Sequence, residues 1–458
     1  MTDLRNSLAI VDAFFIFSMV ALITLYQQQQ QQQQQPHFAY AGGTCINYDQ
    51  TNSTITIICN TSFRDVADTL KDQSVLSNLG GSGDYILKAN LQVNDGATLL
   101  MGPNDGIKWL KIAGANGIIV NGAIQIEGIK ITSWDPSTNN VVPQNTTGSI
   151  KRAYIQFGAS EGSKITNSEF AYLGYNELGR RGLDLFGGGG PSHDIDIRGS
   201  KFHHMWFGFY STGAYNITID RNEFYDNIKY SVDSHSGTHN ITITNNWVHH
   251  NRIGIICSVD CYDILIEGNR IFDNTKAGIF FSRGMQHSIA RSNYIYNTSS
   301  GIILSESPDN IVYNNTIEGA KSEGILLFNP AIPDEGLTQN NHIYNNTISI
   351  SANGINSSRS QNNILTDNKF TNITSSEYLL TRNSTVLITN QDFDNASIRA
   401  GNGSPVGNIV GIEYSGPIEV VEQNDQGMTE RNYYNTNNAP LTKVLSHSLV
   451  VTTEDEDL

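Results

Sequence analysis

The chain has 458 residues and a formal net charge of −16 at pH 7, from 44 acidic and 28 basic side chains. This length is ample for a large hydrophobic core. The acidic balance argues against a nucleic-acid-binding protein, which relies on basic side chains to neutralise phosphates. Charge is nevertheless uneven along the chain, and an acidic protein can still present a local cationic surface. Eight of the eleven histidines lie between 193 and 287, and basic residues gather in and just before that stretch: Arg180, Arg181, Lys229, Arg252, Lys276 and Arg283.

Residues 1–41 read as an export segment. Arg5 precedes an apolar stretch at 8–26, and nine glutamines at 27–35 lead to Ala39-Tyr40-Ala41. This order of charge, apolar run and small-x-small pattern predicts a cleavable signal peptide. An uncleaved membrane anchor is the alternative, because the apolar stretch is nearly long enough to span a bilayer. Either reading predicts export to an extracellular, cell-surface or periplasm-like space, with the membrane contacted only through this segment.

Residues 42–100 are predicted to form an N-terminal cap. Within them, residues 62–76 show helical spacing of apolar positions. A solenoid leaves the end of its core open, so a capping element is expected there.

Four cysteines predict two local disulfides in an exported chain. Cys45 and Cys59 flank a hairpin-like segment, whereas Cys257 and Cys261 lie four residues apart at the end of one strand-like run. Metal binding by these cysteines is less favoured, because the chain has no Cys-x-x-Cys spacing. Thirteen Asn-x-Ser/Thr sequons fit a secreted glycoprotein, although a repeat rich in Asn and Thr also produces them by chance.

An Asn-x-apolar signature recurs within residues 101–385 with steps of 22 to 24 residues and one longer step of 31. Ser200 and Ser168 extend the series upstream, with steps of 22 and 32 residues. A fixed period in this range is typical of a solenoid, in which each repeat is one coil stacked on the last. The longer steps predict loop insertions near 173–191 and 328–339. The signature stands at Asn222, Asn246, Asn269, Asn293, Asn315, Asn346 and Asn368.

Each period holds two short runs of β-branched or aromatic residues, bounded by Asn, Asp, Gly and Ser, which indicates strands. No stretch of the repeat region shows a sustained helical period, and the Leu-x-x-Leu-x-Leu pattern of leucine-rich repeats is absent. The fold class predicted is therefore all-β, a right-handed parallel β-helix with an N-terminal cap, whose repeated Asn side chains stack in ladders. No calcium-binding Gly-Gly-x-Gly-x-Asp repeat is present, so neither Ca²⁺ nor another cofactor is indicated.

Residues 386–458 form a C-terminal segment that loses the period and is predicted to be partly disordered. From 410 to the end it carries nine acidic and two basic residues, finishing in Glu454-Asp455-Glu456-Asp457.

Alignment of the strand-like runs that begin with Gly places a carboxylate and an imidazole on one coil. Ser231 to His235 aligns with 254–258, 278–282 and 301–305, and with 208–212 on the preceding coil. Alternation along a strand sends the third and fifth residues of each run outward. The outward positions are then Tyr210 and Thr212, Asp233 and His235, Ile256 and Ser258, and Phe280 and Ser282. With Tyr230 just before, Asp233 and His235 form a candidate acid/base site; a solvated turn with a surface histidine is the alternative.

The run from Tyr225 to Ser236 resembles the Tyr-Gly-x-Asp-Pro-His-Asp signature of mannuronan C5-epimerases of the periplasmic, alginate-export type. Further landmarks match in the same order, so that the resemblance spans about 130 to 310. They are Ser133-Trp134-Asp135, Ala171-Tyr172-Leu173-Gly174-Tyr175, Phe207-Gly208-Phe209-Tyr210, Gly254-Ile255-Ile256-Cys257-Ser258 and Ser282-Arg283. The chain departs from the signature at Ser234, where the family has Pro, at Ser236, where it has Asp, and at Val259, where it has Arg.

The resemblance implies a right-handed β-helix that inverts C5 of mannuronate within a polymer to give guluronate. It implies that His235 is the base, that Tyr230 and Asp233 complete the catalytic set, and that Arg283 supplies the cation that Val259 does not. Substrate contacts are then expected from Arg181, Tyr210, Lys229, Arg252, Ser258 and Ser282. The expected partner is an anionic polysaccharide, the expected oligomeric state is a monomer, and no metal is expected.

Two other functions remain open from the sequence. A lyase shares the proton-abstraction step and then expels the substituent on O4, and a hydrolase can use the same scaffold. A non-catalytic surface or carbohydrate-binding β-helix is favoured by the departures at Ser234, Ser236 and Val259. The geometry around His235 separates these readings, because scattered side chains would favour the non-catalytic one.

Overall fold

The computed structural model describes residues 44–144, 150–186, 190–331 and 336–381, together with Ser384 and six strands between 386 and 452. The export segment predicted at 1–41 lies outside the described residues. Contacts divide the chain after Thr44, and the fold belongs to the unit Cys45–Leu458. Among the described residues, no helix has the length and apolar character needed to cross a bilayer.

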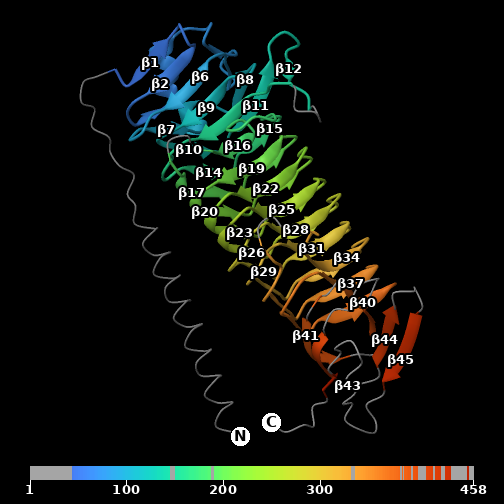
Figure 1. Cartoon of the computed structure of the whole chain (residues 1–458). Helices are drawn as coiled ribbons and strands as arrows, with labels where there is room; N and C mark the ends of the chain where they lie inside the picture. The colour runs from blue at the N-terminus through green and yellow to red at the C-terminus, as the bar shows by residue number, and fades with distance from the viewer. Residues whose placement is uncertain are drawn as a thin grey trace. The chain divides into compact units, whose positions relative to one another are not determined.

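Three long sheets contain the described strands, and their members follow one another in chain order (Figure 1). Sheet A consists of β1 (Ile46–Asp49), β2 (Thr54–Ile57), β6 (Asn90–Val93), β9 (Gly117–Val120), β13 (Tyr154–Phe157), β16 (Gly182–Leu185), β19 (Phe207–Thr212), β22 (Tyr230–His235), β25 (Ile253–Ser258), β28 (Ala277–Ser282), β31 (Ser300–Ser305), β34 (Glu323–Phe328), β37 (Asn353–Ser358), β40 (Ser376–Thr381), β42 (Ala396–Ala400), β44 (Ile418–Gln423) and β45 (Thr429–Tyr434).

Sheet B consists of β3 (Thr61–Ser62), β7 (Thr98–Met101), β10 (Ala123–Glu127), β14 (Lys164–Thr166), β17 (His193–Arg198), β20 (Tyr215–Asp220), β23 (His239–Thr244), β26 (Tyr262–Glu267), β29 (Ile289–Arg291), β32 (Ile311–Tyr313), β35 (His342–Tyr344), β38 (Asn363–Thr366), β41 (Val386–Asp392), β43 (Ile409–Ser415) and β46 (Val451–Thr452). Sheet C consists of β4 (Leu76–Asn78), β5 (Asp84–Leu87), β8 (Trp109–Ala113), β11 (Lys130–Asp135), β12 (Asn140–Val141), β15 (Glu169–Ala171), β18 (Lys201–His203), β21 (Glu223–Tyr225), β24 (Trp247–His249), β27 (Arg270–Phe272), β30 (Tyr294–Tyr296), β33 (Thr316–Glu318), β36 (Thr347–Ser349) and β39 (Lys369–Thr371).

Each coil supplies one strand to sheet C, then sheet A, then sheet B, as β24, β25 and β26 do. Successive coils pair in parallel and in register, so that one inward residue lies on the next: Val248 pairs with Ile271, and Ile271 with Ile295. These side chains are fully buried and belong to one continuous core. The period of the sequence is therefore the number of residues in one coil.

The recurring asparagines form the predicted ladder inside the turn before each strand of sheet C. The side-chain amide of Asn246 donates to Asn269 Oδ1 at 2.9 Å, and that of Asn269 donates to Asn293 Oδ1 at 3.0 Å. The same Asn269 amide also donates to the carbonyl of Ile243 at 2.9 Å. Each rung satisfies backbone groups that a buried turn would otherwise leave without partners, and a second ladder joins Asn227 to Asn251 at 3.1 Å.

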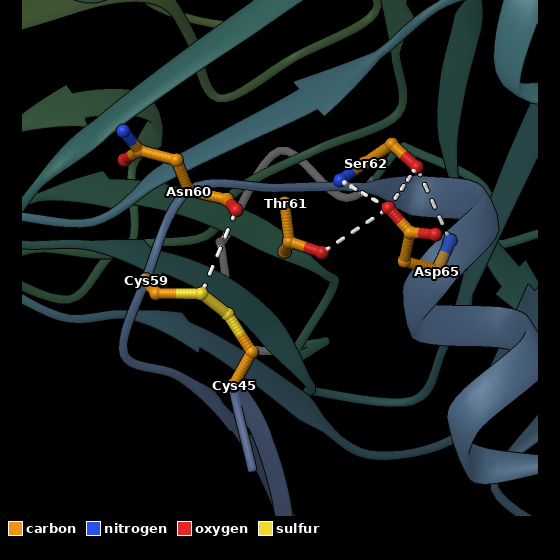
Figure 2. The surroundings of a disulfide bond; sticks show 6 residues. All are labelled: Cys45, Cys59, Asn60, Thr61, Ser62 and Asp65. Carbon is orange, nitrogen blue, oxygen red and sulfur yellow. Dashed lines mark hydrogen bonds between the residues drawn. A yellow bond between two sulfur atoms is a disulfide. The ribbon is translucent and has the colours of Figure 1, made fainter. Parts of the chain in front are cut away.

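A short helix and a disulfide close the N-terminal end of the core. Helix α2 (Phe63–Leu70) begins at Ser62, whose side chain caps the helix while Asp65 accepts from the Ser62 backbone (Figure 2). Phe63 and Val66 enter the core. Parallel pairing begins in the same segment, with β2 on β6 and β3 on β7, so residues 42–100 hold both the capping helix and the first coil. A 3-10 turn, η1 (Pro103–Asp105), follows.

Of the two predicted disulfides, the structure contains one. Cys45 and Cys59 are bonded, with Cα atoms 5.4 Å apart, and the bond ties β1 to the chain just after β2 (Figure 2). The predicted Cys257–Cys261 bond is wrong, because both thiols are free and buried. Both side chains belong to the core, and the Cys261 thiol donates to the carbonyl oxygen of Ser258 at 3.3 Å. Burial raises the pKa of both thiols.

Parallel pairing continues beyond the predicted end of the solenoid at 385. Strand β42 pairs with β40 and β44, and β43 pairs with β41. An antiparallel pair, β44 with β45, follows.

Candidate active site

Strands β19, β22, β25 and β28 of sheet A place the candidate residues in one outward column. Tyr210 pairs with Asp233, Asp233 with Ile256, and Ile256 with Phe280, in the register that the sequence predicts. Val232 and its counterparts on these strands belong to the core, whereas Ile256 and Phe280 belong to a separate cluster on the outer side. The strands follow one another along sheet A in Figure 1. The strand period alone therefore brings Asp233 and His235 to the same face.

A cleft with a volume of about 380 Å³ lies on this face, and all ten predicted site residues line it. Seven further residues complete the lining: Asn176, Trp206, Phe207, Ile253, Ile256, Lys276 and Phe280. The lining combines aromatic and apolar side chains with five basic residues. The side chains of the predicted set thus converge instead of scattering over the surface.

His235 is poised as a neutral imidazole. Burial, aided by the nearby guanidinium groups of Arg283 and Arg181, lowers the pKa of His235 from 6.5 to about 4. Its Nδ1 is hydrogen-bonded to Ser236 Oγ at 2.6 Å, and its ring centroid lies 5.8 Å from that of Tyr210. A histidine that stays neutral at physiological pH can accept a proton.

Tyr230 and Tyr210 keep their phenol protons for the same physical reason. Burial raises the pKa of each hydroxyl. Tyr230, the first residue of β22, packs against Phe207, with ring centroids 5.4 Å apart. Tyr210 accepts a hydrogen bond from Thr212 Oγ1 at 3.3 Å. Two phenols and one imidazole therefore share the cleft, each in the neutral form.

Two buried carboxyl groups flank Tyr210 in the column, because Asp184 pairs with Tyr210 and Tyr210 with Asp233. Burial raises the pKa of Asp233 well above its ordinary value, and the neighbouring Asp184 raises it further against the effect of Arg181 and Arg283. Burial likewise raises the pKa of Asp184 to about 7. One oxygen of each carboxyl group is buried without a hydrogen-bond partner among the described residues. Both groups are therefore suited to carry a proton.

The cations of the cleft have no carboxylate ion-pair partner among the described residues. Arg283 Nη2 donates to Ser258 Oγ at 3.0 Å, and Arg181 stacks its guanidinium over the Tyr210 ring at 4.0 Å. Lys229 and Lys276 lie over aromatic rings, at 4.9 Å from Trp206 and 5.1 Å from Phe280. Arg252 is exposed at the edge of the cleft. Such groups are available to an anionic ligand.

The loop from Gly174 to Gly182 positions Arg181. Gly174 has φ +82°, and a Cβ there would lie 2.2 Å from the Arg181 carbonyl carbon, so only glycine lets the loop close on itself. Asp184 Oδ2 accepts from the Arg181 backbone N–H at 3.0 Å. Beneath the loop, the buried Arg152 side chain donates to the carbonyls of Gly174, Leu173 and His204 at 2.8 to 3.1 Å.

Sequence reasoning missed Asp184, Trp206 and Phe207. Asp184 shares the column of Asp233, but the insertion near 173–191 breaks the period just before β16 and hides the alignment. Trp206 and Phe207 stand immediately before and at the start of β19, in the position of Lys229 and Tyr230 one coil later. That correspondence was available from the repeat.

Potential metal ligands also gather outside the cleft lining. Glu161, His193 and Asp194 each offer a ligand atom, and these atoms lie within 4.8 Å of one another. His193 and Asp194 already have structural partners, because the imidazole stacks on Tyr215 with centroids 4.8 Å apart and Asp194 accepts from the Asn216 amide at 3.0 Å.

Comparisons with known proteins agree with this architecture. A family model described as a right handed beta helix region matches residues 116–285, 182–332 and 254–424. The mannuronan C5-epimerase of Pseudomonas aeruginosa is 26% identical over 189 residues, which cover 38% of this chain and 34% of that protein. The mannuronan C5-epimerase AlgG of Azotobacter vinelandii is 28% identical over 177 residues, covering 36% of this chain and 33% of that one.

The chain thus matches about a third of the length of these curated relatives. Among solved structures, a double mutant of the periplasmic alginate epimerase AlgG superposes with a TM-score of 0.61 at 19% identity, over 87% of this chain and 85% of that one. The A-module of the mannuronan C-5 epimerase AlgE4 from Azotobacter vinelandii superposes with a TM-score of 0.50 at 17% identity, over 71% and 88%. The predicted right-handed parallel β-helix is confirmed.

Proposed function

We propose a function from the premise that this chain belongs to the right-handed β-helix family: it is a polysaccharide C5-epimerase that converts mannuronate-type residues of a polyuronate to guluronate-type residues. One observation carries the proposal, namely that a neutral histidine and unpaired cations meet in one cleft. The similarity to mannuronan C5-epimerases in part of the chain supports the same reaction.

The reaction must remove a weakly acidic proton from the carbon next to a carboxylate. In the proposed mechanism, Arg283 pairs with that carboxylate and stabilises the negative charge that develops on it, which is the largest contribution to the lowering of such a barrier. Asp233 in its protonated form donates a hydrogen bond to the same carboxylate without repelling it. Ser258 orients Arg283 through its hydroxyl.

His235 takes the proton from C5. Nδ1 lies 2.6 Å from Ser236 Oγ. The mechanism requires the tautomer in which Nδ1 carries the proton and donates it to this oxygen, which leaves the lone pair of Nε2 for the substrate. The C5–H bond electrons pass into the enolate-like carboxylate system, and no other bond breaks. Tyr230 then delivers its phenol proton to the opposite face of C5, so that the configuration inverts. Proton exchange with solvent returns His235 and Tyr230 to their neutral forms.

The partner is thus an anionic polysaccharide, bound by a monomer after export. A polymer outside the cell membrane can reach the cleft only if the chain is exported, which is consistent with the signal-like segment at 1–41. The periplasmic origin of the superposable AlgG structure is in line with the same location.

The experiment is incubation of the full chain with polymannuronate in D₂O, followed by NMR. Deuterium at C5 with inverted configuration is expected. His235→Asn should abolish this exchange while leaving polymer binding and the unfolding temperature unchanged, because the side chain lies outside the core. His239→Asn is the matched control, since that histidine lies in sheet B, stacked between Tyr215 and Tyr262, and it should retain full exchange.

Other outcomes decide against the proposal. Unsaturated chain ends that absorb in the ultraviolet would establish a lyase. Exchange that persists in His235→Asn would remove the base from this position. Arg283→Ala should lose most of its turnover, and unchanged turnover would transfer the carboxylate-binding role to Arg252 or Lys229.

A further inference from the structure

A second surface of the solenoid exposes aromatic rings around a cation. It consists of Trp247 on β24, Arg270 and Phe272 on β27, and Tyr294 and Tyr296 on β30, and is called the aromatic platform below. Trp247, Arg270 and Tyr294 occupy one outward column of sheet C on three successive coils. Trp247 is 53% exposed and Tyr294 is 37% exposed. Large exposed apolar groups that gather in this way mark a binding surface more often than isolated ones do.

Arg270 lies within this group of rings without a carboxylate partner among the described residues. Its guanidinium carbon is 5.4 to 5.9 Å from the centroids of all four platform rings. Among the described residues its side chain donates hydrogen bonds to the Tyr296 hydroxyl, from Nε at 3.3 Å and from Nη2 at 3.1 Å. Four other arginines outside the cleft differ, because they pair with aspartate or glutamate: Arg180, Arg198, Arg221 and Arg291.

The acidic neighbours of the platform have partners other than Arg270. Glu223 pairs with Lys201 at 2.9 Å, and Glu318 accepts from the Tyr294 hydroxyl at 2.7 Å. Asp273 lies 3.7 Å from His250 and is also held by the Asn297 amide. Arg270 is therefore the cation of the platform, and none of these three carboxylates forms an ion pair with it.

This combination fits one class of ligand. The C–H faces of pyranose rings pack on flat aromatic side chains, and a uronate carboxylate pairs with a guanidinium. Successive coils are about 4.8 Å apart, which is comparable to the length of one sugar ring along a polymer. Three coils in register can therefore contact consecutive sugars of one strand.

The platform is also continuous with the cleft. Strand β24 ends at His249, and β25 of the cleft begins at Ile253 after a single turn that carries the exposed Arg252. Lys276 stands in the corresponding turn between β27 and β28. Both cations line the cleft, so the turns that connect the platform strands to the cleft strands carry cationic side chains.

We infer that the aromatic platform is a second binding site for an anionic polysaccharide, which holds a neighbouring stretch of the polymer while the cleft acts on another. The inference rests on the proposed function for the identity of the polymer, but the binding itself needs no turnover. Long polymers contact both surfaces and gain affinity from the second contact, whereas short oligomers fill the cleft alone.

The test measures binding separately from catalysis. Native gels containing polymannuronate should retard the wild-type chain, and Trp247→Ala and Arg270→Gln should each weaken this retardation about tenfold in apparent dissociation constant. Gels containing a neutral polysaccharide should retard the Arg270→Gln variant and the wild type equally. In turnover assays both variants should show a higher KM for long polymers, with kcat for short oligomers unchanged.

Two matched variants control for the loss of exposed or stacked side chains. Ile350 is 55% exposed, and Tyr344 on sheet B stacks on Tyr313 with centroids 4.8 Å apart. Ile350→Ala and Tyr344→Ala should be retarded like the wild type. Equal retardation of Trp247→Ala and wild type overturns the inference. If retardation depends on the platform but no C5 exchange occurs, the second binding site stands and the epimerase proposal fails. If C5 exchange occurs but the platform variants bind like the wild type, the epimerase proposal stands and the second site fails.

Discussion

The base of the proposed reaction depends on contacts that no sequence pattern reports. The outward position of His235 follows from the alternation along β22 and was predicted. Its lowered pKa could not be predicted in this way. The shift arises from burial, together with the charges of Arg283 on a later coil and Arg181 on an earlier loop. Ser236 replaces the aspartate of the resembled signature and holds Nδ1 instead, so a departure in sequence preserves a hydrogen-bond partner for the imidazole.

The titration of His235 has a defined sign. Since its folded pKa of about 4 lies below its ordinary 6.5, the neutral form is favoured by folding. Its contribution to stability is present above pH 6.5 and is lost as the pH falls through about 4. The proposed activity, which needs the neutral imidazole, should fall in the same acidic range and not near neutrality.

The contribution of Asp184 to stability should depend on pH in the opposite direction, and the Asp184→Asn variant tests this expectation. Burial raises its pKa from 3.8 to about 7, so its contribution to stability is present below pH 3.8 and is lost as the pH rises through about 7. An asparagine stays neutral and keeps an oxygen to accept from the Arg181 N–H. Asp184→Asn should therefore unfold at a higher temperature than wild type at pH 8, with the difference disappearing near pH 4.

Thermal unfolding followed by circular dichroism across this range provides the measurement. Asp196→Asn is the control, because that carboxylate is more exposed and pairs with Arg198 at 2.6 Å. It should show no gain at pH 8. An Asp184→Asn variant that is less stable than wild type at every pH would mean that the carboxylate is ionised and needed.

At the scale of elements, regular coils were predictable and inserted loops were not. The Asn signature and the aligned runs predicted the register of β19 to β31, because each coil repeats the same inward and outward positions. The loop from Gly174 to Gly182 has no counterpart on other coils, so nothing in the period indicated that it carries Arg181 to the cleft or that Asp184 follows it. Spacing also misled for Cys257 and Cys261, since it does not reveal that both thiols lie buried in the core without bonding to each other.

Arg152 should be a positioning residue for that loop. It is 1% exposed and donates to three carbonyls, and its pKa is lowered by burial to about 10. Arg152→Met would remove the donor of the Gly174 and His204 carbonyls, at a cost of about 1–3 kcal/mol for each group that stays unsatisfied. The Leu173 carbonyl would keep the Trp206 backbone N–H, at 3.0 Å. The unfolding temperature should fall, and KM for the polymer should rise more than kcat falls, because Arg181 loses its position.

Arg152→Lys separates charge from hydrogen bonding. Lysine retains the positive charge but cannot reach three carbonyls in the planar arrangement of a guanidinium, so it should show an intermediate loss of stability and a similar rise in KM. Wild-type KM in Arg152→Met, despite lower stability, would limit Arg152 to a structural role.

At the scale of the whole molecule, the net charge of −16 conceals a cationic cleft. The cleft cations lack carboxylate partners among the described residues, so their field is available to an anionic polymer. Screening shortens electrostatic range from about 10 Å at 0.1 M salt to about 3 Å at 1 M. KM for the polymer should therefore rise steeply with salt, whereas kcat should change little.

Steady-state kinetics at several salt concentrations checks this expectation. Lys229→Gln, which removes one cleft cation, should reduce the dependence of KM on salt. Lys321→Gln, whose lysine does not line the cleft, should leave it unchanged. A KM of the wild type that does not change with salt would mean that the aromatic and apolar side chains of the cleft, and not its cations, bind the polymer.

The register of the coils also has an evolutionary consequence. Because every coil repeats the same hydrogen bonds to its neighbours, duplication of one genetic segment of 22 to 24 codons inserts a complete coil without disturbing the pairing on either side. Each such event would lengthen the sugar-binding face by about 4.8 Å. The number of sugars bound can thus change in evolution by the gain or loss of whole coils, while the residues that carry out the chemistry on β22 stay unchanged.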